Sequence, residues 1–188
     1  GIPVDGPSPQ RGMVFHQSSL YPWLSVTENV EFGLKNRKVP RRERKARVAE
    51  YLERFKLTRL ATQRVFRIED YHQLILISFA RCLVTEPEIV LIGDEPLNEI
   101  NDRFRLKLQS MLLQLWRDKK PMLLTATSDA EAALTMSSRV YILGGRPGRL
   151  VKDVDVPFFD QAATEGMESV RHLPEFREMR QQLIRNII

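Results

Sequence analysis

The apolar segment Ile89–Ile92 constrains the fold of this chain more than any other feature. A proline lies two positions before it and Gly93 follows it, which is typical of a short strand buried on both faces of a parallel sheet. Two carboxylates, Asp94 and Glu95, come next. Ligands bind at the carboxyl ends of such strands, so these acids are candidates to hold a metal ion or to activate water. The alternative is a strand that simply ends in a polar turn.

The rest of the sequence alternates predicted strands and helices. Apolar runs predict strands at 12–15, 122–126, 139–143 and 150–156, the last two forming a hairpin. Helical periodicity predicts helices at 25–32, 41–55, 70–84, 102–118, 129–136 and 175–186. This order indicates an α/β protein with a mostly parallel sheet flanked by helices. A polar linker is expected after Pro157.

Two of the predicted helices have distinctive local signals. Ser25 and Glu28 have the spacing of a capping box, and Gly33 is expected to end the helix that they begin. The helix at 70–84 is apolar nearly all round, which predicts that it is buried.

Composition narrows the class of protein. A length of 188 residues suits one domain, or one domain with a small appendage. No apolar run approaches the roughly 20 residues that cross a bilayer, and the first residues do not resemble a secretory signal. Cys82 is the one cysteine, so no internal disulfide is expected. A cytoplasmic location, or an equivalent reducing compartment, is predicted.

The net charge of +5 comes largely from the basic run RKVPRRERKAR at 37–47. Such a run can bind nucleic acid or an anionic membrane surface, but it is more often a solvated helix face. Here Glu43 interrupts it, and no aromatic platform or reading motif accompanies it. A nucleic-acid partner is therefore not expected.

An apolar and aromatic segment precedes the first predicted helix. It has the sequence LYPWL and consists of Leu20, Tyr21, Pro22, Trp23 and Leu24. It either plugs the core or offers a hydrophobic surface to a partner.

The order of these segments resembles the ATP-binding subunits of ABC importers, in particular the nitrate, sulfonate, taurine and bicarbonate group. The resemblance rests on RGMVF, LYPWLSVTENVEFGL, TEPEIVLIGDEP, SDAEAALTMSSRVYIL, GGRPGRLV and PEFREMRQQLI. Such subunits are P-loop ATPases that dimerise head to tail around two ATP molecules and drive a membrane partner. The segment 20–24 resembles the surface on which they receive that partner.

The resemblance implies a partial P-loop ABC-ATPase fold with an inserted helical subdomain. Residues 1–24 would form the N-terminal loop, a core strand and the Q-loop region, and 25–85 the helical subdomain. Residues 86–156 would form the α/β core with a Walker B-like strand, and 157–188 a C-terminal linker and helix.

Several family motifs are altered in this sequence. Nothing in it matches the phosphate-binding loop, GxxxxGK followed by Ser or Thr, whose amides and lysine cradle triphosphate. His16 stands where the family has the glutamine that positions water and Mg²⁺, and Gln17 comes one place later. Asn101 replaces the aspartate of the D-loop, and Ser128 replaces the switch histidine.

The family signature LSGGQ is also altered. It aligns with Glu69, Asp70, Tyr71, His72 and Gln73, of which only the glutamine is kept. Bulky residues thus replace the two glycines that let the backbone approach phosphate, and an acid that repels phosphate replaces the serine.

The Walker B strand keeps its acids, but Gly93 is an extra residue. If the glycine is an insertion, Asp94 corresponds to the Mg²⁺-side acid and Glu95 to the catalytic base. Without a gap, Gly93 takes the aspartate position and Asp94 the glutamate position.

Two hypotheses follow, with a weaker third. The first is a catalytically inactive ABC-ATPase-like protein that acts as a scaffold or regulatory subunit of a protein complex on a membrane. It would need no cofactor and no metal, and would bind its partner through 20–24 and the apolar helix 74–79. The second is an importer subunit with a degenerate ATP site, seen without its N-terminal part. It would use Mg-ATP, held through Asp94, and pair with an intact ABC ATPase in a dimer. The third, another enzyme built on Asp94, Glu95 and His16, has no supporting spacing.

Overall fold

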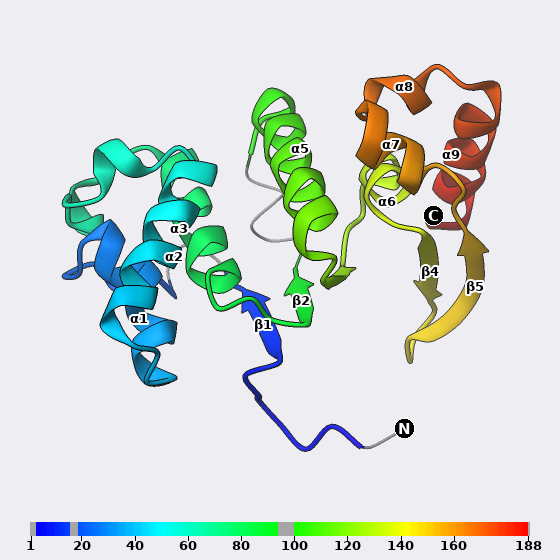
Figure 1. The fold of residues 1–188 in the computed structure, drawn as a ribbon. Helices are drawn as coiled ribbons and strands as arrows, with labels where there is room; N and C mark the ends of the chain where they lie inside the picture. Colours follow the sequence, from blue (N-terminus) through cyan, green and yellow to red (C-terminus); the bar gives the residue numbers. More distant parts are fainter. Residues whose placement is uncertain (1–2, 16–18, 94–99, 188) are drawn as a thin grey trace. The chain divides into compact units, whose positions relative to one another are not determined.

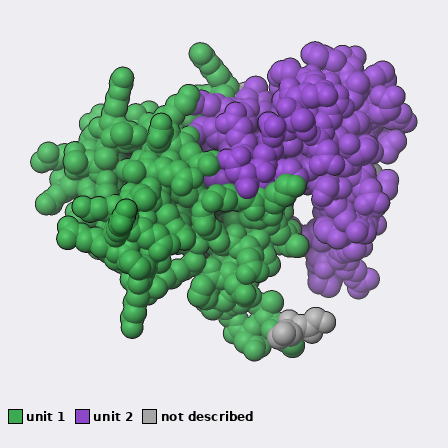
Figure 2. Space-filling model, viewed as in Figure 1, with its two compact units in different colours: residues 1–105, 119–124 green, residues 106–118, 125–188 purple. Residues whose placement is uncertain are grey.

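The computed structural model describes residues 3–15, 19–93 and 100–187 (Figure 1). The chain divides into two compact units (Figure 2). The first unit consists of residues 1–105 and 119–124, and the second of 106–118 and 125–188. In the described residues, no helix has both the length and the apolar character that a membrane span requires.

The first unit contains a small sheet of β1 (Arg11–Val14), β2 (Ile89–Ile92) and β3 (Met122–Thr125), in that order. β1 and β2 are parallel, with Val14 opposite Ile92. This parallel sheet flanked by helices confirms the predicted α/β class. Burial on both faces of β2 was expected and is wrong, because Val90 and Ile92 are buried whereas the alternate residues are only half-buried.

Three helices of the first unit pack together beside the sheet: α1 (Val26–Asn36), α2 (Arg41–Arg54) and α3 (Tyr71–Leu83). Short 3-10 turns, η2 (Thr58–Leu60) and η3 (Val65–Arg67), connect α2 to α3. The predicted capping box is present, since the Glu28 amide donates to Ser25 Oγ at 3.2 Å and the Ser25 amide donates to Glu28 Oε2 at 2.8 Å.

Helix α3 is the buried helix that the sequence predicts. The same burial contradicts the proposal of 74–79 as an exposed docking surface. Four of its apolar side chains are at most 6% exposed: Ile75, Leu76, Ile77 and Phe79. α3 contacts α1, α2 and β1 inside the unit, and these buried side chains belong to its core.

The predicted helix end at Gly33 is also wrong, because α1 continues to Asn36. A Cβ atom on Gly33 would lie 2.7 Å from Thr85 Cγ2, and one on Gly12 would lie 2.7 Å from Cys82 Sγ. These glycines therefore let α1 and β1 approach the segment in which α3 ends.

Helix α5 (Asp102–Lys119) belongs to both units, and its residues 106–118 are part of the second. The predicted hairpin is confirmed, with Tyr141 opposite Asp153. The predicted polar linker is wrong, because two short helices, α7 and α8, follow Pro157. The elements of this unit are α6 (Ala130–Met136), β4 (Arg139–Gly144), β5 (Arg149–Asp155), α7 (Phe159–Glu165), α8 (Glu168–Arg171) and α9 (Pro174–Ile187).

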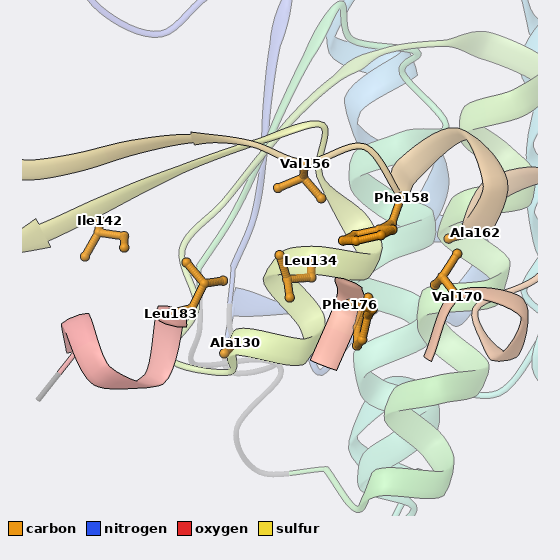
Figure 3. Packing of buried hydrophobic residues seen from close by; sticks show 9 residues of the cluster. All are labelled: Ala130, Leu134, Ile142, Val156, Phe158, Ala162, Val170, Phe176 and Leu183. Atoms are coloured by element: carbon orange, nitrogen blue, oxygen red, sulfur yellow. The ribbon is translucent and has the colours of Figure 1, made fainter. Parts of the chain in front are cut away.

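A hydrophobic cluster holds the second unit together (Figure 3). Leu134 of α6 and Val170 of α8 are fully buried in it, and the rings of Phe158 and Phe176 meet edge to face at 5.3 Å. Its members are Ala130, Leu134, Ile142, Val156, Phe158, Ala162, Val170, Phe176 and Leu183. Phe158 explains the missed helices, since it anchors the start of α7 in this core.

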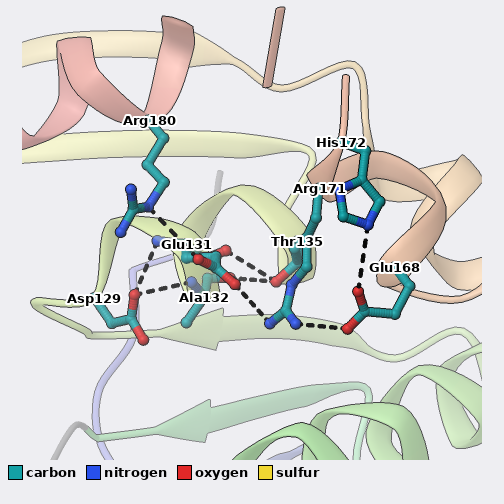
Figure 4. A network of polar contacts seen from close by, with 8 residues as sticks. All are labelled: Asp129, Glu131, Ala132, Thr135, Glu168, Arg171, His172 and Arg180. Atoms are coloured by element: carbon teal, nitrogen blue, oxygen red, sulfur yellow. Dashed lines mark hydrogen bonds and ion pairs between the residues drawn. The ribbon is translucent and has the colours of Figure 1, made fainter. Parts of the chain in front are cut away.

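Ion pairs tie α6 to the two C-terminal helices (Figure 4). The carboxylate of Glu131 lies 2.6 Å from Arg171 Nη2 of α8 and 3.5 Å from Arg180 Nε of α9. Arg171 also pairs with Glu168 at 2.7 Å. Three helices thus share one charge network at the surface of the unit.

Candidate functional site

Three of the predicted site residues, His16, Asp94 and Glu95, lie outside the described residues, as does Gln17. β2 ends at Ile92, and Gly93 separates this strand from the two acids in the sequence. In the described parts of the chain, no group of three or more His, Cys, Asp or Glu side chains could hold a metal ion. The sequence prediction for these positions stays a prediction.

The altered signature forms the start of α3. Asp70 caps this helix, because its Oδ1 accepts a hydrogen bond from the His72 amide at 2.9 Å. Its carbonyl oxygen accepts from the Gln73 amide at 3.0 Å. The His72 amide is therefore already bonded to a carboxylate, and the Gln73 amide to a backbone carbonyl oxygen. A phosphate that binds at this helix start would have to compete with both acceptors.

The structure brings the signature position and the D-loop position together. The ring of His72 stacks on Phe104, with centroids 4.1 Å apart, and its Nε2 lies 3.5 Å from Asn101 Nδ2. Asn101 Oδ1 in turn accepts from the Phe104 amide at 2.9 Å and so caps α5. The contact between Phe104 and His72 was not predicted from the sequence.

Ser128 lies in the second unit, on the loop before α6. It is exposed, between two residues that shape this loop. Thr127 Oγ1 accepts from the Asp129 amide at 3.1 Å, and Asp129 Oδ1 accepts from the Glu131 amide at 2.9 Å, drawn in Figure 4. The loop that carries the altered switch position is therefore held by its own helix cap.

The segment 20–24 was predicted either to plug the core or to offer a surface to a partner, and its residues differ in this respect. Leu20 is 5% exposed and belongs to the core, whereas Trp23 is 62% exposed. The centre of the Tyr21 ring lies 5.6 Å from that of Trp23 and 4.7 Å from that of Phe32. Leu20 is therefore not available to a partner, while Trp23 is.

A buried asparagine that the sequence reasoning missed holds this segment. Asn29 of α1 is fully buried; its Oδ1 accepts from the Tyr21 amide at 2.9 Å, and its Nδ2 donates to the Tyr21 carbonyl at 3.0 Å. The Asn29 side chain thus pairs with both backbone groups of Tyr21, as the backbone of a neighbouring β-strand would. The sequence feature that could have revealed its burial is its position on the apolar face of the helix, which Val26, Val30 and Leu34 form.

An arginine supports the same segment from α3. Arg81 Nη1 donates to the Ser19 carbonyl at 2.6 Å, and the guanidinium lies 5.0 Å from the centre of the Tyr21 ring. Burial lowers the pKa of Arg81. Beside it lies a hollow of about 210 Å³ that Phe32 and Cys82 also line. Aromatic rings and one partly desolvated cation make this surface suited to a polypeptide partner.

Comparison with known proteins gives a consistent family. No protein-family model matches the chain. The taurine import ATP-binding protein TauB of Pelagibacter ubique is 32% identical over 98% of this chain and 69% of its own length. The protein of the same name from Pseudomonas putida is 34% identical over 100% of this chain and 71% of its own length.

A solved structure agrees in fold. It is cbiO1 from Clostridium perfringens, described as part of the ABC transporter complex cbiONQ. It superposes with a TM-score of 0.70 at 20% identity, over 93% of this chain and 67% of that one. At this identity the likeness concerns the fold alone.

Proposed function

The chain belongs to the ATP-binding subunits of ABC transporters, and from this premise we propose that it serves an importer and has a degenerate ATP site. The importer hypothesis thus replaces the inactive scaffold as the main interpretation. The observation that carries it is the identity of 32–34% along essentially the whole chain to proteins named as import ATP-binding subunits.

The proposal of a degenerate site is supported by the start of α3. The Asp70 carboxylate occupies the amide of His72, and the His72 ring packs on Phe104. By analogy with the importer family, Asp94 of this chain would hold Mg²⁺ and Glu95 would act as the base when Mg-ATP is bound. Both residues follow β2 outside the described residues, so no catalytic step is derived through them.

The proposed partner is a membrane subunit that docks at Trp23. The exposed indole of Trp23 and the neighbouring Tyr21 ring provide a large apolar contact surface, of the kind that dominates binding energy at interfaces. The names of the relatives suggest that the transported solute is taurine or a similar small sulfonate. This solute would be recognised elsewhere in the transporter.

Uptake of radiolabelled taurine tests the proposal. Deletion of the gene in its host should abolish energy-dependent uptake, and the intact gene should restore it. Uptake that is unchanged by deletion would argue against a taurine importer. Hydrolysis of ATP by the complex purified from host membranes tests the broader importer role, whatever the solute.

A second candidate function is a subunit that binds its partners but does not hydrolyse ATP. The observation in its favour is the occupied helix start at Asp70. Replacing Glu95 by Gln in the native complex separates the two candidates. Loss of ATP hydrolysis in that variant supports a working site, whereas unchanged hydrolysis assigns the activity to another subunit.

A further inference from the structure

All of the chain's excess positive charge lies in one short segment. Residues 37–47 contain seven Lys or Arg residues and one Glu, a net charge of +6, whereas the whole chain has +5. The other 177 residues together therefore carry −1. A charge that is concentrated in this way produces a local field, which an evenly distributed charge would not.

Three of the seven cations have structural partners. Arg37 donates to the Thr85 carbonyl at 2.8 Å, Arg44 donates to Glu31 at 2.8 Å, and Arg47 pairs with Glu43 at 2.6 Å. These contacts join α1 and α2 and tie the loop between them to the end of α3. They explain why part of the segment is basic.

The other four cations have no such explanation. Lys38, Arg41, Arg42 and Lys45 are exposed, and none forms an ion pair with a described residue. Arg41 and Lys45 are one helical turn apart, where like charges repel. Cations in the first turn of a helix are also disfavoured by the helix dipole. Within the described residues, these four cations thus have no ion pair that explains their presence.

We propose that Lys38, Arg41, Arg42 and Lys45 form a basic patch that binds anionic phospholipid headgroups. Clusters of four or more cations next to a membrane are sufficient for such binding. Membership of an ABC transporter brings the chain to a membrane surface. Nucleic acid is disfavoured, because Tyr51 of α2 and Phe55, which follows this helix, are each 1% exposed and offer no stacking platform. The inference depends on family membership and not on ATP binding.

Vesicle co-sedimentation of the chain tests this patch. Vesicles of equal parts phosphatidylglycerol and phosphatidylcholine should bind the chain, and vesicles of phosphatidylcholine alone should not. The quadruple variant Lys38→Gln, Arg41→Gln, Arg42→Gln, Lys45→Gln should weaken binding by about 600-fold, at about fivefold per cation. Added salt should release the wild-type chain, because the attraction is electrostatic and screened.

A matched control keeps the result specific to this patch. The variant Arg146→Gln, Arg149→Gln, Lys152→Gln, Arg177→Gln removes the same total charge from exposed positions of the second unit. It should bind the anionic vesicles within about threefold of wild type, since these cations lie outside the patch. Equal weakening in both variants, or binding of wild type to both kinds of vesicle, would overturn the proposal. So would tighter binding of duplex DNA than of anionic vesicles at the same salt concentration.

Discussion

Replacing Asn29 by Ala should show how strongly one buried amide holds the segment 20–24. Three hydrogen bonds of its side chain, to Tyr21 N, Tyr21 O and Ser25 O, lie between 2.9 and 3.1 Å. At about 1 kcal/mol each, their loss costs about 3 kcal/mol. Alanine returns up to about 0.7 kcal/mol through its higher helix propensity. The free energy of unfolding should therefore fall by about 2 kcal/mol or more.

Urea unfolding followed by circular dichroism measures this change. Asn36→Ala is the matched control, because Asn36 is exposed on the last turn of the same helix. It should change the free energy of unfolding by less than about 0.5 kcal/mol. Amide hydrogen exchange at Tyr21 should accelerate in the Asn29 variant and not in the control. If both variants unfold at the same urea concentration, the assignment of Asn29 as the anchor of this segment is wrong.

Three further predictions concern single side chains. Trp23→Ala should reduce recovery of the membrane partner at least tenfold while changing the free energy of unfolding by less than about 0.5 kcal/mol, because the indole is exposed; equal recovery by wild type and variant in pull-downs would contradict the docking role. Burial raises the pKa of the Cys82 thiol to about 12, so the thiol should react slowly with an alkylating reagent at pH 8 in the folded chain and rapidly in urea. Mass spectrometry measures the alkylated fraction, and rapid alkylation of the folded chain would refute this prediction. Hydrogen bonds from the Ser25 amide and hydroxyl lower the pKa of Glu28, so this contribution to stability is present above the usual glutamate pKa and is lost as pH falls below it. Wild type should therefore lose more stability than Ser25→Ala between pH 5 and pH 3, and parallel losses in denaturant titrations would show that the capping box does not contribute.

The local signals in the sequence predicted most of the elements. The capping box at Ser25 depends only on residues three positions apart, and the alternation of apolar runs reports each element by itself. The strands at 11–14, 89–92 and 122–125 were therefore found to within about one residue. The order of the segments along the sequence also indicated the family.

The failures all involve contacts between distant segments. Gly33 has the local appearance of a helix end, but its missing Cβ makes room for Thr85, which is far away in the sequence. The helices after Pro157 depend on Phe158 entering a core shared with α6 and α9. Asn29 has a polar side chain on an apolar face, and only the position of Tyr21 explains it. A pattern within one segment contains none of this information.

The two tight contacts at the end of α3 limit how this chain can change. Gly12 meets Cys82 and Pro87, and Gly33 meets Thr85, so two elements approach the short segment in which α3 ends. Enlarging either glycine requires smaller residues at the positions that it meets. We therefore expect natural variants to exchange bulk together, at 12 with 82 and 87, and at 33 with 85. Engineered libraries that vary only one member of a pair should be depleted of folded proteins.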